Sequence, residues 1–195
     1  DLAIVDPPYG IGMKTDLPMS YISTPSWGNN KGRDYTVKDW DTETPAQEYF
    51  NELCRVSKNQ IVWGGQYFTD KLPVSGGWIV WDKCVVMPTL GKCELAWTSM
   101  KNSVDLVTLL WAGYRKCEVT ERIHPTQKPV ALYSWLLDKY AKKGMKILDT
   151  HLGSGSIALA CYDHGLDLDA WEIDEEYHAG AVARYKEHSR QVKLF

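Results

Sequence analysis

The chain has 195 residues, of which 44% are hydrophobic and 24% are charged, and its formal net charge is -3. This length and composition predict one soluble domain. The sequence contains no run of about 18 apolar residues and opens without the basic flank of a secretory signal, so we expect no membrane protein. Taken alone, the mildly acidic total disfavours a nucleic-acid binder, because such proteins usually carry dense positive charge.

Charge is distributed unevenly along the chain. Residues 144–180 contain one basic residue and eight acidic residues and carry -7, which leaves +4 for the remainder. This division suits a chain in which one region meets a cation and another meets an anion, although a solvated acidic surface explains the acidic segment equally well.

The cysteines show no pattern typical of disulfides or zinc sites. Their number is odd, and they form no CxxC pair. We therefore predict reduced thiols and a cytoplasmic location. The five residues are Cys54, Cys84, Cys93, Cys117 and Cys161.

The first predicted element is a buried strand at residues 1–5, which ends where two prolines cannot continue a central strand. Because the chain opens directly on this strand, we expect further sequence upstream, so that the chain is truncated at its N-terminus. Residues 10–41 are rich in Gly, Ser, Pro, Asn and Thr and have no sustained period, which predicts a long loop of functional importance.

Beyond this loop, hydrophobic spacing predicts strands that alternate with helices, as in a mostly parallel α/β sheet. Residues 113–128 are polar and are expected to form a connection. Most of the strand tryptophans are expected in the core: Trp63, Trp78, Trp81, Trp97 and Trp111. The predicted strands cover 60–63, 78–81, 95–97, 104–111, 146–149 and 168–173, and the predicted helices cover 45–56, 129–143, 153–164 and 175–188.

A glycine-rich turn follows the predicted strand 146–149 and lets the backbone approach a ligand closely. Glu172 lies 19 residues after Gly153, where an acid can hold ribose hydroxyls. NAD and S-adenosylmethionine both contain such a ribose, and Asp149 with the acidic segment favours the cationic S-adenosylmethionine. An ordinary tight turn is the alternative. The turn reads Asp149-Thr150-His151-Leu152-Gly153-Ser154-Gly155.

Asp6-Pro7-Pro8-Tyr9 is a second candidate site. An amino group conjugated to an aromatic ring is a poor nucleophile, because its lone pair is delocalised. The Asp6 carboxylate and the Pro7 carbonyl could accept its two N–H groups and localise that lone pair. Tyr9 offers a ring face for a base flipped out of a duplex. A proline turn that merely ends the strand is the alternative.

A third candidate site precedes the predicted helix 129–143 and reads His124-Pro125-Thr126-Gln127-Lys128-Pro129. Thr126 and Lys128 lie where free backbone N–H groups and the positive helix end favour an anion, such as the carboxylate of the cofactor's methionine part. Simple helix capping explains this motif equally well.

Together with Trp63-Gly64-Gly65-Gln66-Tyr67-Phe68, these motifs in this order resemble the β-class amino-methylating DNA methyltransferases, whose catalytic motif precedes the cofactor motif. The resemblance spans nearly the whole chain. It implies a Rossmann-like α/β methyltransferase fold with circularly permuted motif order and a mostly parallel central sheet. It also implies S-adenosylmethionine as donor and double-stranded DNA as partner. Members with Asp before Pro-Pro usually modify adenine N6, which makes a flipped adenine the expected acceptor.

The resemblance assigns roles to matching positions, and no metal site is expected. Where the family commonly has Pro-Phe, this chain has Thr150-His151, so the role of His151 stays open. The catalytic residues are Asp6, Pro7, Pro8 and Tyr9. The cofactor-binding residues are Asp6, Pro7, His124, Thr126, Lys128, Asp149, Thr150, Gly153, Ser154, Gly155, Glu172 and Ile173.

The chain leaves little room for a separate DNA-reading module, so residues 1–195 are expected to form one catalytic domain. DNA contacts then fall to residues 10–41 and 113–122, or to a partner subunit, as in a homodimer. The +4 remainder includes both loops, whereas the acidic segment coincides with the cofactor half, so net charge no longer argues against DNA. The alternatives are methylation of an RNA base or a protein glutamine amide, a NAD-dependent oxidoreductase, and an inactive cofactor-binding partner.

Overall fold

The computed structural model describes residues 1–12, 40–85, 91–100, 102–112, 115–118 and 123–190. Its centre is a seven-stranded sheet with the strand order β5-β3-β4-β2-β1-β8-β9. Neighbouring strands pair in parallel, except that β4 runs antiparallel to both β2 and β3. The predicted mostly parallel α/β sheet is confirmed. The strands are β1 (Leu2–Val5), β2 (Asn59–Trp63), β3 (Trp78–Asp82), β4 (Cys93–Thr98), β5 (Val104–Thr108), β8 (Lys146–Asp149) and β9 (Asp167–Ala170).

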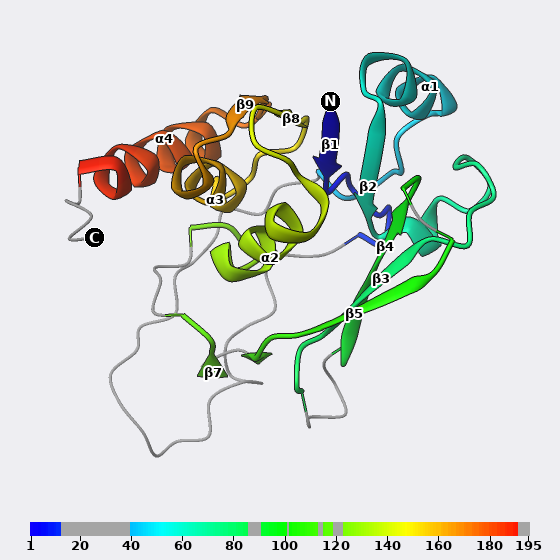
Figure 1. Ribbon diagram of the computed structural model, residues 1–195, viewed down its shortest axis with the longest axis horizontal. Coiled ribbons are helices and arrows are strands. Elements are labelled where there is room, and N and C mark those ends of the chain that lie inside the picture. The colour runs from blue at the N-terminus through cyan, green and yellow to red at the C-terminus, as the bar shows by residue number, and fades with distance from the viewer. Residues whose placement is uncertain (13–39, 86–90, 101, 113–114, 119–122, 191–195) are drawn as a thin grey trace.

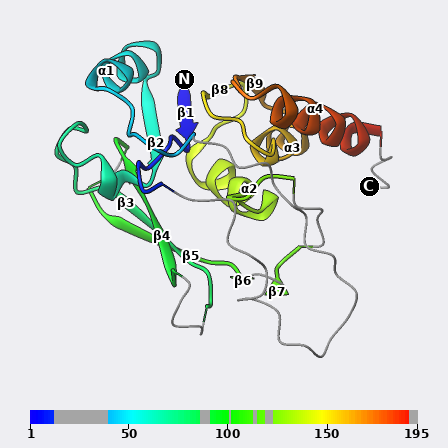
Figure 2. The same cartoon turned by 180° about the vertical axis from the view of Figure 1, so that it is seen from behind.

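The helices cover both faces of the sheet, which is why β1 is apolar and buried along its whole length. Leu2 and Ile4 face the core shared with α2 and α3, whereas Ala3 and Val5 face the core shared with α1. Figures 1 and 2 show α3 and α4 side by side near β8 and β9, and α1 beside β2. The helices are α1 (Gln47–Val56), α2 (Val130–Tyr140), α3 (Ser156–His164) and α4 (Glu175–Arg190).

Two predicted strands are longer than the observed ones, because each observed strand ends opposite the last residue of its partner strand. The predicted strand 104–111 stops at Thr108, which pairs with Asp82, the last residue of β3. Beyond it, β6 (Trp111–Ala112) and β7 (Arg115–Lys116) form a small separate hairpin. The predicted strand 168–173 stops at Ala170, which pairs with Asp149 at the end of β8, so Glu172 and Ile173 lie in the following loop.

The core contains most of the predicted tryptophans. Trp63, Trp81 and Trp97 are buried, as predicted, whereas Trp78 and Trp111 are half-buried and pack against the core. All five cysteines are free, as predicted, and only Cys161 among them is buried. In the described ranges, no helix is long and apolar enough to cross a membrane.

Candidate functional site

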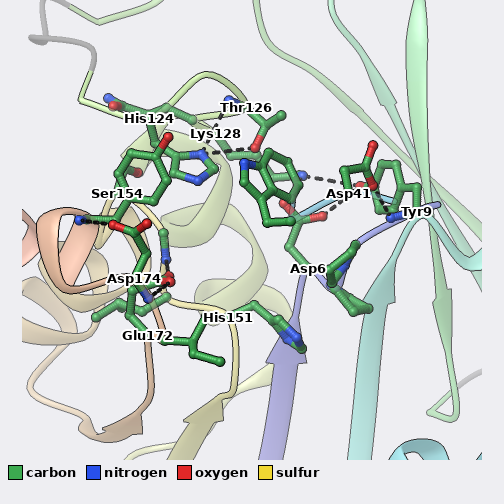
Figure 3. Close-up of a pocket in the computed structure, with 18 of the residues that line it drawn as sticks. Asp6, Tyr9, Asp41, His124, Thr126, Lys128, His151, Ser154, Glu172 and Asp174 are labelled. Atoms are coloured by element: carbon green, nitrogen blue, oxygen red, sulfur yellow. Dashed lines mark hydrogen bonds and ion pairs between the residues drawn. The ribbon is translucent and has the colours of Figure 1, made fainter. Parts of the chain in front are cut away.

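The three candidate motifs meet at one cavity of about 530 Å³. Because β1, β8 and β9 are parallel neighbours, the loops that follow them emerge at the same edge of the sheet, where α/β proteins commonly bind ligands. Figure 3 shows Asp6, Tyr9 and Asp41 on one side of the cavity and Ser154, Glu172 and Asp174 on the other. The predicted site residues that line it are Asp6, Pro7, Pro8, Tyr9, His124, Thr126, Lys128, Gly153, Ser154, Glu172 and Ile173.

Three predicted cofactor residues do not line this cavity. Asp149 is buried, its Oδ1 accepts the His151 backbone N–H at 3.0 Å, and burial raises its pKa to about 7. The Thr150 hydroxyl lies 2.7 Å from the Tyr49 hydroxyl. Gly155 has a φ of 72°, and a Cβ atom there would lie 2.9 Å from the Ala181 Cβ, so this glycine lets the turn before α3 pack against α4.

The Asp6 carboxylate is held at both oxygens. The Tyr9 hydroxyl donates to Oδ1 at 2.6 Å, and the Lys128 ammonium donates to Oδ2. Burial and the nearby Asp6 carboxylate raise the pKa of Tyr9 well above its usual value, so its hydroxyl stays protonated and donates. Since a carboxylate oxygen can accept two hydrogen bonds, each oxygen retains a site for a further N–H group.

The Tyr9 ring rests on the segment from Trp63 to Phe68. It stacks on Tyr67 with the ring centroids 5.0 Å apart and meets Phe68 edge-on at 6.2 Å. Gly64 has a φ of 68°, and a Cβ atom there would lie only 2.1 Å from Tyr9 Cε1. The glycine of this motif therefore makes room for the Tyr9 ring.

Asp41 fixes the backbone of the catalytic loop, a role that sequence reasoning missed. Its buried carboxylate accepts the Tyr9 N–H at 2.7 Å and the Gly10 N–H at 3.0 Å. These partners are separated by more than 30 residues in the chain and share no motif, so no local signal identified Asp41. The cavity is also lined by other residues that were not predicted: Trp40, Glu94, Gln127, Tyr133, His151, Leu152, Asp174 and Tyr177.

The start of α2 differs from the prediction. The Glu118 carboxylate accepts the N–H groups of Val130 and Ala131 at 3.0 and 3.1 Å, so the helix end already holds an anion from this chain. Lys128 turns instead toward Asp6. The expectation of free backbone N–H groups at this helix end is therefore wrong for Val130 and Ala131, whereas Thr126 and Lys128 both line the cavity, as expected of cofactor-binding residues.

His124, in the motif 124–129, and Glu172, after β9, both form hydrogen bonds with neighbouring backbone. The His124 ring packs against the Tyr177 ring at 4.3 Å, and its Nδ1 accepts the Thr126 backbone N–H at 3.3 Å. Glu172 Oε2 accepts the Gly153 N–H at 2.7 Å, so the acid after β9 shapes the glycine turn after β8. Glu172 Oε1 accepts the Asp174 N–H at 2.9 Å.

His151 is a neutral side chain at the cavity wall, because burial lowers its pKa to about 4. Its Nδ1 lies 3.0 Å from the Thr150 hydroxyl, and its ring meets the Tyr49 ring edge-on at 5.5 Å. His151 is therefore an uncharged residue of the cavity wall that forms a hydrogen bond with Thr150.

Comparison with known proteins identifies the family. The family model described as DNA methylase, of the N6/N4 type, matches residues 75–183, which is more than half of the chain. The chain belongs to the N6/N4 DNA methylase family. It is therefore a DNA methyltransferase that modifies an adenine N6 or a cytosine N4 amino group, not a NAD-dependent oxidoreductase.

Solved structures share the fold of this DNA methyltransferase. The M1.HpyAVI–SAM complex is 18% identical with a TM-score of 0.58, and the match covers 94% of this chain and 88% of that chain. PvuII DNA methyltransferase, described as cytosine-N4-specific, is 10% identical with a TM-score of 0.59, and the match covers 100% and 80%. TTHA0409 from Thermus thermophilus, complexed with S-adenosyl-L-methionine, is 14% identical with a TM-score of 0.50, and the match covers 98% and 88%. The search of curated proteins found no match.

Proposed function

We propose that this DNA methyltransferase transfers a methyl group from S-adenosylmethionine to N6 of an adenine in double-stranded DNA. The observation that carries the proposal is the Asp6 carboxylate, which lines the cavity with both oxygens fixed and each able to accept one more N–H group. The resemblance to family members with Asp before Pro-Pro favours adenine over cytosine.

The residues of the cavity fit S-adenosylmethionine, which two of the similar structures contain. Five carboxylates and one ammonium line the described cavity, and this excess of negative charge suits a sulfonium and an ammonium. Glu172 retains acceptor sites for ribose hydroxyls beyond its two backbone bonds. Next to it, Ile173 is 98% exposed and lines the cavity, which provides apolar surface for a purine ring. His124, Thr126, Gly153 and Ser154 complete the proposed binding surface.

The chain's own residues prepare the amino group for transfer. Bound S-adenosylmethionine supplies an electrophilic methyl group on a positively charged sulfur. Asp6 and the Pro7 carbonyl accept the two N–H groups of the flipped adenine, so the nitrogen lone pair localises and faces the donor, while Tyr9 stacks on the base. An N–C bond then forms as the C–S bond breaks, the bonding electron pair goes to sulfur, and Asp6 accepts the proton that the methylated nitrogen loses.

Cytosine N4 is the second candidate acceptor, because it presents a chemically equivalent amino group and the PvuII enzyme of similar fold is described as cytosine-N4-specific. The two candidates are separated by incubating the chain with labelled S-adenosylmethionine and double-stranded DNA and then digesting the DNA to nucleosides. We expect N6-methyladenine. Label found only in N4-methylcytosine would refute the adenine assignment.

The role of Asp6 has its own test. Asp6→Asn removes the charge but keeps the size, and we expect kcat to fall by at least about 10²-fold, the usual contribution of a positioned acid or base. The calorimetric Kd for S-adenosylmethionine should change by less than about threefold. Asp138→Asn, at an exposed side chain on α2, is the control and should retain wild-type activity. Undiminished transfer by Asp6→Asn would refute the role.

Four further predictions remain proposals. We propose that residues 1–195 form one catalytic domain and that DNA is contacted by residues 10–41 and 113–122, of which 13–39, 113–114 and 119–122 lie outside the described residues. A homodimer would supply further contacts, and the oligomeric state can be measured by sedimentation. The five free thiols support a reducing compartment such as the cytoplasm.

A further inference from the structure

Lys128 is a buried charge that the proposed chemistry does not yet use. Its side chain is only 4% exposed, and its ammonium lies between two carboxylates, Asp6 and Glu94. Burial by itself lowers the pKa of Lys128, but Asp6 and Glu94 outweigh burial and the net pKa is raised, so the ammonium remains charged.

The ammonium reaches the catalytic loop at more than one atom. It donates to Asp6 Oδ2, and it lies 3.4 Å from the Tyr9 hydroxyl, which itself donates to Asp6 Oδ1. It also lies 5.4 Å from the centre of the Trp63 ring, a favourable distance for a cation over an aromatic face. Lys128 and Tyr9 together leave the Asp6 carboxylate little freedom to rotate.

Behind Lys128, the charges continue to alternate in sign. Glu94 Oε2 lies 3.2 Å from the Lys128 ammonium, and Glu94 Oε1 lies 2.5 Å from the Lys83 ammonium. The row of Asp6, Lys128, Glu94 and Lys83 therefore contains two negative and two positive charges from four separate segments of the chain. A buried charge is tolerated when it is paired in this way, whereas removing one partner leaves the others uncompensated.

We propose that Lys128 is a positioning residue that acts through Asp6. Its ammonium orients the Asp6 carboxylate so that the unused acceptor sites face the amino group, and the Glu94 carboxylate balances the charge of the ammonium. This inference rests on the proposed methyl transfer. It replaces the expectation from sequence that Lys128 holds the cofactor carboxylate, because the ammonium already has two carboxylate partners within the chain.

The two roles predict different kinetics for Lys128→Met, which keeps the length of the side chain and removes its charge. A positioning residue affects the chemical step, so we expect kcat to fall by about 10²-fold, as when a catalytic group is misplaced by about 1 Å. The KM and the calorimetric Kd for S-adenosylmethionine should change by less than about threefold. A cofactor anchor gives the opposite result, a much weaker Kd with kcat preserved at saturating cofactor, and that result would overturn the proposal.

A second variant separates an electrostatic role from a purely structural one. In Lys128→Met, Asp6 and Glu94 lose the cation that they share, and the two negative charges then repel each other. Adding Glu94→Gln removes that repulsion, so the double variant should recover at least about fivefold in kcat over Lys128→Met. If Lys128 only filled space, Glu94→Gln would bring no recovery, and the proposal would be wrong.

The control is Lys139→Met, which removes another paired lysine. Lys139 pairs with Asp105 at 2.7 Å, and neither residue lines the cavity. This variant should keep wild-type kcat. The test of Lys128 does not depend on the adenine assignment. If the chain methylates cytosine N4 instead, the same comparison of Lys128→Met with wild type still applies. A wild-type chain that transfers no methyl group to either base would refute both proposals.

Discussion

Replacing Gly64 by alanine should inactivate the proposed site without unfolding the protein. A Cβ atom at this position would lie 2.1 Å from Tyr9 Cε1, whereas ordinary contacts begin at about 3.4 Å, so the Tyr9 ring must move by about 1.3 Å. The Tyr9 hydroxyl now lies 2.6 Å from Asp6 Oδ1, and a shift of this size away from Asp6 would exceed hydrogen-bonding distance. Misplacement by about 1 Å can reduce a rate by about 10²-fold, which is the loss that we expect in kcat/KM.

Gly165→Ala is the matched control for backbone strain. Gly165 has a φ of 63°, close to the 68° of Gly64, but no atom lies within 4 Å of its Cβ position. Both variants carry the cost of a left-handed alanine, about 1–2 kcal/mol of stability. Only Gly64→Ala displaces Tyr9.

Methyl transfer from labelled S-adenosylmethionine to DNA, measured well below the unfolding temperature, gives kcat/KM for both variants, and urea titration gives their free energies of unfolding. We expect Gly64→Ala to lose about 1–3 kcal/mol more stability than Gly165→Ala, because it also overpacks the Tyr9 ring, and we expect a rate difference of about 10²-fold between them. If Gly64→Ala were within about threefold of Gly165→Ala in kcat/KM, the close fit between Gly64 and Tyr9 would have no catalytic consequence, and the reasoning would fail.

Other variants test the core, the electrostatics and the loop after Pro8. Leu136→Ala, at a fully buried position of α2, should lower the free energy of unfolding by about 2–5 kcal/mol in urea, whereas Leu106→Ala, at a largely exposed side chain on β5, should change it by less than about 0.5 kcal/mol. Burial raises the pKa of Asp149 to about 7, above its ordinary 3.8, so the folded state binds the extra proton and wild-type stability falls as pH rises from about 4 to 7. Asp149→Asn should remove this loss, so its stability relative to wild type should increase over that range; a difference that does not change with pH would contradict the assignment. Burial lowers the pKa of His151 to about 4, below its ordinary 6.5, so this residue raises stability with pH between about 4 and 6.5, and that trend should become visible in Asp149→Asn. Asp41→Ala leaves two backbone N–H groups without their acceptor and should reduce kcat/KM by about tenfold, whereas Asp41→Asn keeps an acceptor oxygen and should lose less; equal losses would argue against a role for these bonds.

Local patterns predicted the secondary structure well where a single segment contains the whole signal. The buried strand β1 follows from an apolar run stopped by two prolines, and α2 follows from its apolar spacing between Pro129 and Gly144. Predictions failed where the end of a strand is set by its partner strand. The apolar run from Val104 to Trp111 extends beyond Thr108, which pairs with the last residue of β3. The chain then forms the β6–β7 hairpin.

The sequence by itself determined the fold class, the family resemblance and most of the cavity wall, because each motif is a short continuous segment placed at the end of a predicted strand or at the start of a predicted helix. Only the tertiary structure decided how the charges are paired. Lys128 pairs with Asp6, Glu118 caps the start of α2, and Asp41 holds the backbone of Tyr9. Each of these contacts joins residues that are distant or unrelated in the sequence, and a buried charge is stabilised by whichever opposite charge the fold brings within reach.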